Sequence, residues 1–269
     1  MREKIREATV GDVVLRLFKE NGAYKGAVIL GKAVKVVEGN DADDVWRRMH
    51  DEVGKSNPKY VGFGGARNRF LHFFPNAFQS AGYAERERDY KVAAKSKLDS
   101  TAPVQEAATG SGFGEAILAI YRATNLLSRF EKTRMQDVLR GPNTDPFIQA
   151  AARFTLGEGK PALLDMERAL KPHDNAKWTV VTYLPFLWQP DDHMYLKPEV
   201  TKDFAERVGH RLASDYEARL NIDVYDSLLD LVAKTASELA DLKPQDRIDV
   251  QSFIWVVGNY KLDSEMPVP

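Results

Sequence analysis

Apolar and polar positions alternate along the first forty residues in short runs that are separated by turn signals. The runs cover residues 13–18, 24–30 and 33–37, and they are rich in valine, leucine and isoleucine. The Asn21-Gly22 pair between the first two runs favours a tight hairpin, because both residues tolerate a positive φ. We therefore expect two or three antiparallel strands in this segment.

The periodicity changes from two residues to that of a helix after Gly39. Acidic residues open the new segment, where they suit the positive end of a helix dipole; they are Asp41, Asp43 and Asp44. Apolar residues then recur at helical spacing on one face; they are Val45, Trp46, Met49 and Val53. The first part of the chain thus predicts an antiparallel ββα unit.

Helical periodicity dominates the remaining chain. We expect helices over residues 83–98, 115–140 with an interruption near Asn125 or Ser128, 146–156, 161–170, 198–212 and 223–242.

Three further segments have strand-like or ambiguous patterns. Residues 60–65 and 70–75 are predicted to be strands or irregular buried segments around a glycine-permitted bend. Residues 178–187 form a continuous apolar run, which predicts a buried strand that Pro185 limits. Residues 248–257 are compatible with either a strand or a helix.

These elements predict an α/β or α+β fold, in which the N-terminal unit packs on a larger, mainly helical body. The two parts are residues 1–57 and 58–269, and they are also compatible with one continuous domain.

Composition excludes several kinds of chemistry. The chain has no cysteine, which excludes disulfides, thiolate metal sites, iron–sulfur clusters and cysteine nucleophiles. It has no GxSxG motif, which disfavours a serine hydrolase. The charged start of the chain lacks an apolar signal core, and no stretch reaches the roughly 20 apolar residues of a membrane span. We expect a protein of the bacterial cytoplasm without a membrane partner, and the sequence leaves its oligomeric state and cofactors open.

Charge is distributed unevenly although the net charge is −1. Between Lys55 and Arg153 there are 15 lysines and arginines against 9 aspartates and glutamates, a surplus of 6 positive charges. A segregation of this kind is typical of a basic surface on an acidic body, unless folding mixes the two.

Glycine, arginine and phenylalanine are concentrated within residues 62–70 of this basic segment. Glycines allow close approach of a backbone to phosphate, arginines pair with phosphate oxygens, and aromatic rings stack on bases. A glycine-permitted bend with solvated arginines and core phenylalanines is the alternative. The predicted anion-binding or nucleic-acid-binding residues are Arg67, Arg69, Arg86, Arg88, Lys91 and Lys95.

The preferred function is therefore a regulatory protein that binds nucleic acid or another polyanion. A metal-dependent phosphodiesterase or nuclease is the first alternative, because carboxylates beside a lysine can hold a metal and orient a water. Its candidate groups are Glu87, Asp89, Asp249, Lys91 and His193. For Glu87 and Lys91, the favoured interpretation is an ordinary ion pair one helical turn apart on a solvated helix face. The second alternative is an interaction subunit without catalysis.

The C-terminal third contains two distinctive segments, HMYLKP at 193–198 and IDVQSFIW at 248–255. Together they resemble the ending of a type of uncharacterised bacterial protein, and the resemblance implies no activity and no functional residue. Asp249 and Gln251 lie among apolar residues, so if buried they need hydrogen-bond partners. We expect a polar clasp of Lys197, Asp249 and Gln251.

Overall fold

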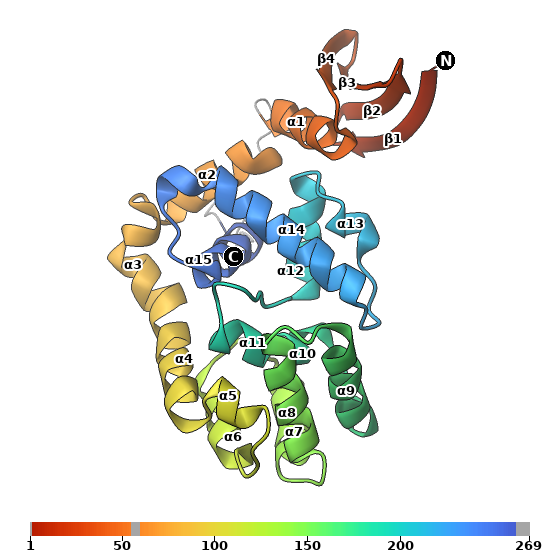
Figure 1. Cartoon of the computed structure of the whole chain (residues 1–269). Coiled ribbons are helices and arrows are strands. Elements are labelled where there is room, and N and C mark those ends of the chain that lie inside the picture. The colour runs from red at the N-terminus through yellow and green to blue at the C-terminus, as the bar shows by residue number, and fades with distance from the viewer. Residues whose placement is uncertain (1, 55–59, 262–269) are drawn as a thin grey trace.

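A small sheet and helix at the N-terminus stand at one end of a larger helical body (Figure 1). The computed structural model describes residues 2–54 and 60–261. This arrangement confirms the expected α+β architecture. The expected boundary between residues 57 and 58 lies outside the described residues.

The N-terminal sheet has four antiparallel strands in the order β1-β2-β3-β4. They are β1 (Arg2–Val10), β2 (Val13–Glu20), β3 (Ala23–Leu30) and β4 (Ala33–Gly39). At the predicted hairpin, Asn21 and Gly22 have φ values of 51° and 84°, as a turn with two positive φ angles requires. β1 was not expected, because most of its residues are exposed and therefore show no apolar alternation.

One face of the sheet packs on α1 (Ala42–Gly54) and forms a small core of its own. Leu15, Leu17 and Val28 from the sheet meet Val45 and Met49 from the helix. The opposite face has no covering element among the described residues. On that face Val34 and Val36 are 58% and 57% exposed.

The body holds a second, larger core. Its helices are α2 (Gly62–Phe73), α3 (Ala81–Tyr83), α4 (Asp89–Thr101), α5 (Val104–Ala107), α6 (Gly114–Ala123), α7 (Arg129–Leu139), α8 (Thr144–Thr155), α9 (Lys160–Leu170), α10 (Trp178–Val181), α11 (Tyr183–Trp188), α12 (Pro198–Arg207), α13 (Leu212–Asp215), α14 (Ile222–Glu238) and α15 (Arg247–Asn259). Short 3-10 turns cover η1 (Ala77–Gln79), η3 (Lys171–His173) and η4 (Ala240–Leu242), and a π-helical turn covers η2 (Ala84–Arg88). None of the helices in the described part of the chain combines the length and the apolar character that crossing a bilayer requires.

Two predictions of secondary structure were wrong. The segments at 60–65 and 70–75 belong largely to α2, and the run at 178–187 forms α10 and α11. Every residue of α10 and α11 is buried. A short run that is apolar on all sides has the same pattern in a buried strand and in a buried helix, so periodicity could not separate them.

The N-terminal unit contacts the body through one side of α1. Asp51 Oδ1 accepts a hydrogen bond from the Phe63 amide at 2.8 Å, and Arg47 pairs with Glu238 at 2.8 Å. The buried ring of His50 lies against Gly209, which has a φ of +71°. A Cβ at Gly209 would lie 2.6 Å from His50 Nδ1.

Gly209→Ala should therefore destabilise the protein by at least about 1 kcal/mol, because the left-handed backbone and the contact with His50 both oppose a side chain. Gly64→Ala is the matched control, since Gly64 lies in α2 with open space around it. There alanine should stabilise the helix by about 0.5 to 1 kcal/mol. Urea unfolding of both variants tests this, and equal effects would contradict the proposed packing.

Candidate functional site

The glycine-rich segment forms the first two turns of α2 and offers no open phosphate cradle. Asp51 already occupies the amino end of this helix through its bond to the Phe63 amide. Burial raises the pKa of Asp51, although the amide bonds oppose this effect. A carboxylate of the chain itself therefore stands where a bound phosphate was expected.

The two arginines of this segment bind α2 to α14, η4 and the end of α15. Arg67 makes a two-pronged ion pair with Asp241, with Nη2 2.7 Å from Oδ2, and it also donates to the Glu238 carbonyl at 3.0 Å. Arg69 donates to the carbonyls of Val257 and Tyr260 at 2.9 and 2.6 Å. Both side chains thus hold the helices of the body together.

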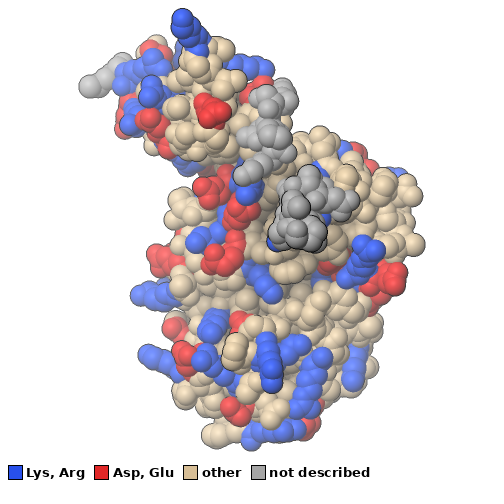
Figure 2. All heavy atoms as spheres, turned by 180° about the vertical axis from the view of Figure 1, so that it is seen from behind, with Lys and Arg blue, Asp and Glu red and all other residues tan. Residues whose placement is uncertain are grey.

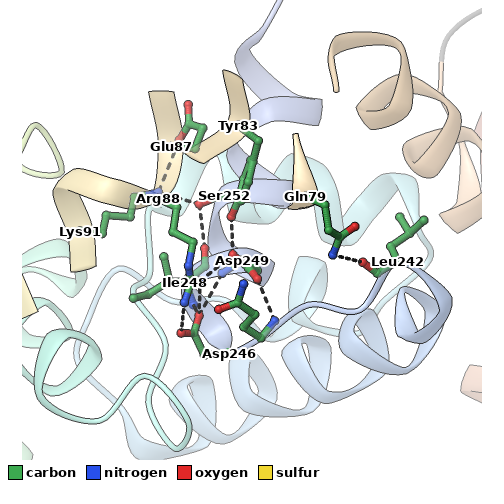
Figure 3. A network of polar contacts seen from close by, with 11 residues as sticks. Gln79, Tyr83, Glu87, Arg88, Lys91, Leu242, Asp246, Ile248, Asp249 and Ser252 are labelled. Atoms are coloured by element: carbon green, nitrogen blue, oxygen red, sulfur yellow. Dashed lines mark hydrogen bonds and ion pairs between the residues drawn. The ribbon is translucent and has the colours of Figure 1, made fainter. Parts of the chain in front are cut away.

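A buried polar network surrounds the π-helical turn η2 and the start of α15 (Figure 3). Arg88 reaches from η2 to Asp246, with both guanidinium nitrogens between 2.7 and 2.9 Å from its carboxylate, and to Asp249 at 2.7 Å. Burial lowers the pKa of Arg88, but the two carboxylates outweigh that effect and raise it overall. Asp246 also caps α15 by accepting the Ile248 amide at 2.8 Å.

Asp249 is the centre of this network and is fully buried. Its Oδ1 accepts hydrogen bonds from Arg88 and from the Tyr83 hydroxyl, the latter at 2.5 Å, and its Oδ2 accepts the Gln245 amide at 2.7 Å. Burial and the neighbouring Asp249 carboxylate raise the pKa of Tyr83. The two carboxylate oxygens therefore have three donors.

Lys91 and Glu87 form a second part of the network, one helical turn apart. Lys91 Nζ lies 3.4 Å from Glu87 Oε2 and donates to Ser252 Oγ at 2.8 Å (Figure 3). The Tyr260 hydroxyl donates to Glu87 Oε1 at 2.8 Å. Burial lowers the pKa of Lys91 to about 8, although Glu87 opposes this shift. Lys91 is 0% exposed, so its ammonium group has no contact with solvent.

The six predicted cations therefore do not form one open field. Arg69, Arg88 and Lys91 are bonded within the body, and Arg67 is paired with the exposed Asp241. Lys95 pairs with Asp99 at 2.7 Å and donates to the Trp188 carbonyl at 3.2 Å. Arg86 is exposed and makes no hydrogen bond or ion pair with another described residue.

The expected polar clasp does not form. Asp249 bonds to η2 and Tyr83, whereas Lys197 donates to the Leu126 carbonyl at 3.1 Å and lies 5.0 Å from the centre of the Trp255 ring. The buried Gln251 Oε1 has no hydrogen-bond partner among the described residues. The sequence indicated correctly that a buried Asp249 needs partners, but two of its three donors, Arg88 and Tyr83, come from a segment more than 150 residues away in the chain.

The groups of the nuclease hypothesis do not meet at one place. Glu87, Lys91 and Asp249 share the buried network, whereas Asp89 is exposed. His193 is buried elsewhere, with Nδ1 2.9 Å from the Tyr225 hydroxyl and Nε2 3.0 Å from the Thr155 carbonyl. In residues 2–54 and 60–261 no group of three or more acidic or histidine side chains could hold a metal ion.

A basic hollow between α6 and α7 was not singled out by the sequence analysis. Its volume is about 320 Å³, and its described lining contains three cationic side chains and no carboxylate. The lining residues are Leu118, Tyr121, Arg122, Arg129, Lys132, Thr133 and Gln136. The only indication of this hollow in the sequence was the surplus of positive charge between Lys55 and Arg153, a range that contains all three cations.

Neutral acceptors hold two of the three cations of the hollow. Arg122 donates to Gln136 Oε1 at 2.7 Å, and Lys132 donates to the Thr124 carbonyl. Arg129 is exposed and forms no ion pair with a described residue. The Glu115 carboxylate is bonded to Arg140, and this bond lowers the pKa of Glu115, with a smaller contribution from the charge of Arg122. None of the three cations of the hollow is therefore bonded to a carboxylate of the described residues.

The far side of the molecule agrees with this distribution. In Figure 2, lysine and arginine side chains gather more densely than acidic ones over the part of the body farthest from the N-terminal sheet.

Comparison of the chain with models of protein families, with curated proteins and with solved structures finds no match.

Proposed function

We propose that this protein binds a phosphate-bearing polyanion without catalysis, through the basic hollow between α6 and α7. The observation that carries the proposal is that Arg122, Arg129 and Lys132 line one hollow, in which no described lining residue is a carboxylate. Three cations that share a concave surface attract anions more strongly than the same charges dispersed among acidic neighbours.

The state of the other cations supports the choice of this hollow. Arg67 and Arg88 are bonded to carboxylates of the chain, so a phosphate would have to displace an existing ion pair. Arg122 and Lys132 would exchange only neutral partners for charged phosphate oxygens. Binding at the hollow thus gains charge-assisted hydrogen bonds without breaking an ion pair.

The triple variant Arg122→Gln/Arg129→Gln/Lys132→Gln should weaken polyanion binding by at least about 100-fold at low salt, because three lost charge-assisted contacts of at least about 1 kcal/mol each amount to about 3 kcal/mol or more. Fluorescence anisotropy with a labelled DNA duplex, with inorganic polyphosphate as competitor, measures the effect. For the original protein, log affinity should fall with log salt with a slope of about −2.7 for three phosphate contacts on a duplex.

The matched control is Lys19→Gln/Lys32→Gln/Lys243→Gln, which removes the same charge from three exposed lysines outside the hollow. Both triple variants are also compared at physiological salt, where distant surface charges are largely screened and the control should retain affinity within about threefold. An equal loss in both triple variants would show a dependence on net charge alone and would contradict a site at the hollow. Absence of binding at low salt would contradict polyanion binding itself.

A further inference from the structure

Phe130 is an exposed aromatic residue of α7, adjacent in this helix to residues that line the basic hollow. Its side chain is 78% exposed, and among the described large apolar residues that are exposed it is the one aromatic. It is the second residue of α7, directly after Arg129 and one turn before Thr133, both of which line the hollow. Side chains three positions apart on a helix have Cβ atoms about 5 to 6 Å apart.

The Phe130 ring is not part of the core of the body. The buried residues of α7 are Met135, Val138 and Leu139, which lie on another side of the helix. Phe130 makes no ring contact with any described residue, in contrast to the stacked pair of Tyr121 and Tyr183, whose centres are 4.3 Å apart. Packing within the body therefore gives no reason for an aromatic side chain here.

The carboxylate nearest to Phe130 in the sequence is turned inward. Glu131 Oε2 accepts the Ser128 amide at 2.8 Å, and Oε1 accepts the hydroxyl of the largely buried Thr179. Glu131 thus closes the capping box of α7 and is not presented beside the ring. Asp137 is exposed but follows two turns later, roughly 10 Å along the helix.

We propose that the polyanion is a single-stranded nucleic acid, with one base stacked on Phe130 and the adjoining phosphates on Arg122, Arg129 and Lys132. This inference rests on the proposed function of the hollow. A positive groove beside an exposed aromatic ring is the combination that binds single strands, because every base has a face that can stack. In a duplex the bases are stacked on each other, so the ring has no base face to contact.

The test compares three probes in the full chain, namely a labelled 12-nucleotide single strand, its 12-base-pair duplex and inorganic polyphosphate. Phe130→Ala should weaken binding of the single strand by about 5- to 100-fold, the range for loss of one stacked base. It should leave binding of the duplex and of polyphosphate within about twofold, with the same salt dependence, because no cation is lost. Phe130→Tyr should retain single-strand affinity.

Leu156→Ala is the matched control, since Leu156 is another exposed apolar side chain, 47% exposed and outside the hollow. It should leave all three affinities unchanged. Equal binding of the single strand by Phe130→Ala and the original protein would overturn this inference, as would an equal loss for all three probes. The proposed function would survive that outcome if the Arg122/Arg129/Lys132 variant still lost its affinity, and it would fail separately if that variant bound normally.

Discussion

Replacing Asp249 with alanine should lower the free energy of unfolding by about 3 to 5 kcal/mol, the range for removing one partner of a buried ion pair. The carboxylate is fully buried and accepts bonds from Arg88, the Tyr83 hydroxyl and the Gln245 amide. Alanine would leave all three donors without this acceptor in a place that water reaches poorly. Urea unfolding followed by circular dichroism measures the difference.

The control for this prediction is Asp99→Ala. Asp99 also pairs with a cation of the basic segment, Lys95, at 2.7 Å, but its side chain is 45% exposed. An exposed pair of this kind contributes about 0 to 1 kcal/mol. If Asp249→Ala and Asp99→Ala lost similar, small amounts of stability, the network around η2 would not be the structural centre that its geometry indicates.

The division into a sheet unit and a helical body could be predicted because it depends on local signals. The Asn21-Gly22 turn and the change of period after Gly39 are properties of a few neighbouring residues. β1 was not predicted because most of its residues are exposed. The segment of α10 and α11 was predicted as a strand because it is buried on all sides. Both cases lack the contrast between two faces on which periodicity depends.

The roles of the charged residues could not be predicted in the same way. Arg88 and Asp249 are 161 residues apart in the chain and 2.7 Å apart in the structure. A sequence shows that an arginine is present but not whether a distant carboxylate neutralises it. In the sequence, Arg67 and Arg88 therefore looked as available for binding an anion as Arg122 and Arg129. In the fold, Arg67 and Arg88 are paired with carboxylates, whereas Arg122 and Arg129 line the hollow.

The network also places an ionisable lysine in the interior. Lys91 is fully buried, with Glu87 Oε2 at 3.4 Å and Ser252 Oγ at 2.8 Å as its polar contacts. One carboxylate at this distance does not replace the water shell of an ammonium group. Burial accordingly lowers the pKa of Lys91 to about 8, whereas the pKa of a lysine in the unfolded chain is about 10.4.

This difference predicts that the contribution of Lys91 to stability rises with pH. Between about pH 8 and pH 10.4 the unfolded chain binds a proton at Lys91 that the folded protein has released, so raising the pH favours the folded state. The expected gain between pH 8 and pH 9.5 is about 1.5 kcal/mol, because the slope rises from half of its limit at pH 8 toward the limiting value of about 1.4 kcal/mol per pH unit. Below pH 8 both states hold the proton, and the slope vanishes.

The measurement requires a reference that keeps the buried tyrosines, because these also titrate at high pH. Tyr83, Tyr121 and Tyr183 are buried with raised pKa values, so their own effect is to reduce stability at high pH, because only the unfolded chain ionises near pH 10. The variant Glu87→Gln/Lys91→Met keeps these tyrosines and removes both charges of the pair. Urea unfolding of the two proteins from pH 7 to pH 9.5 should give a stability difference that moves in favour of the original chain as pH rises. A difference that stays constant, or moves toward the variant, would mean that Lys91 keeps its proton in the folded protein and that Glu87 compensates the buried charge.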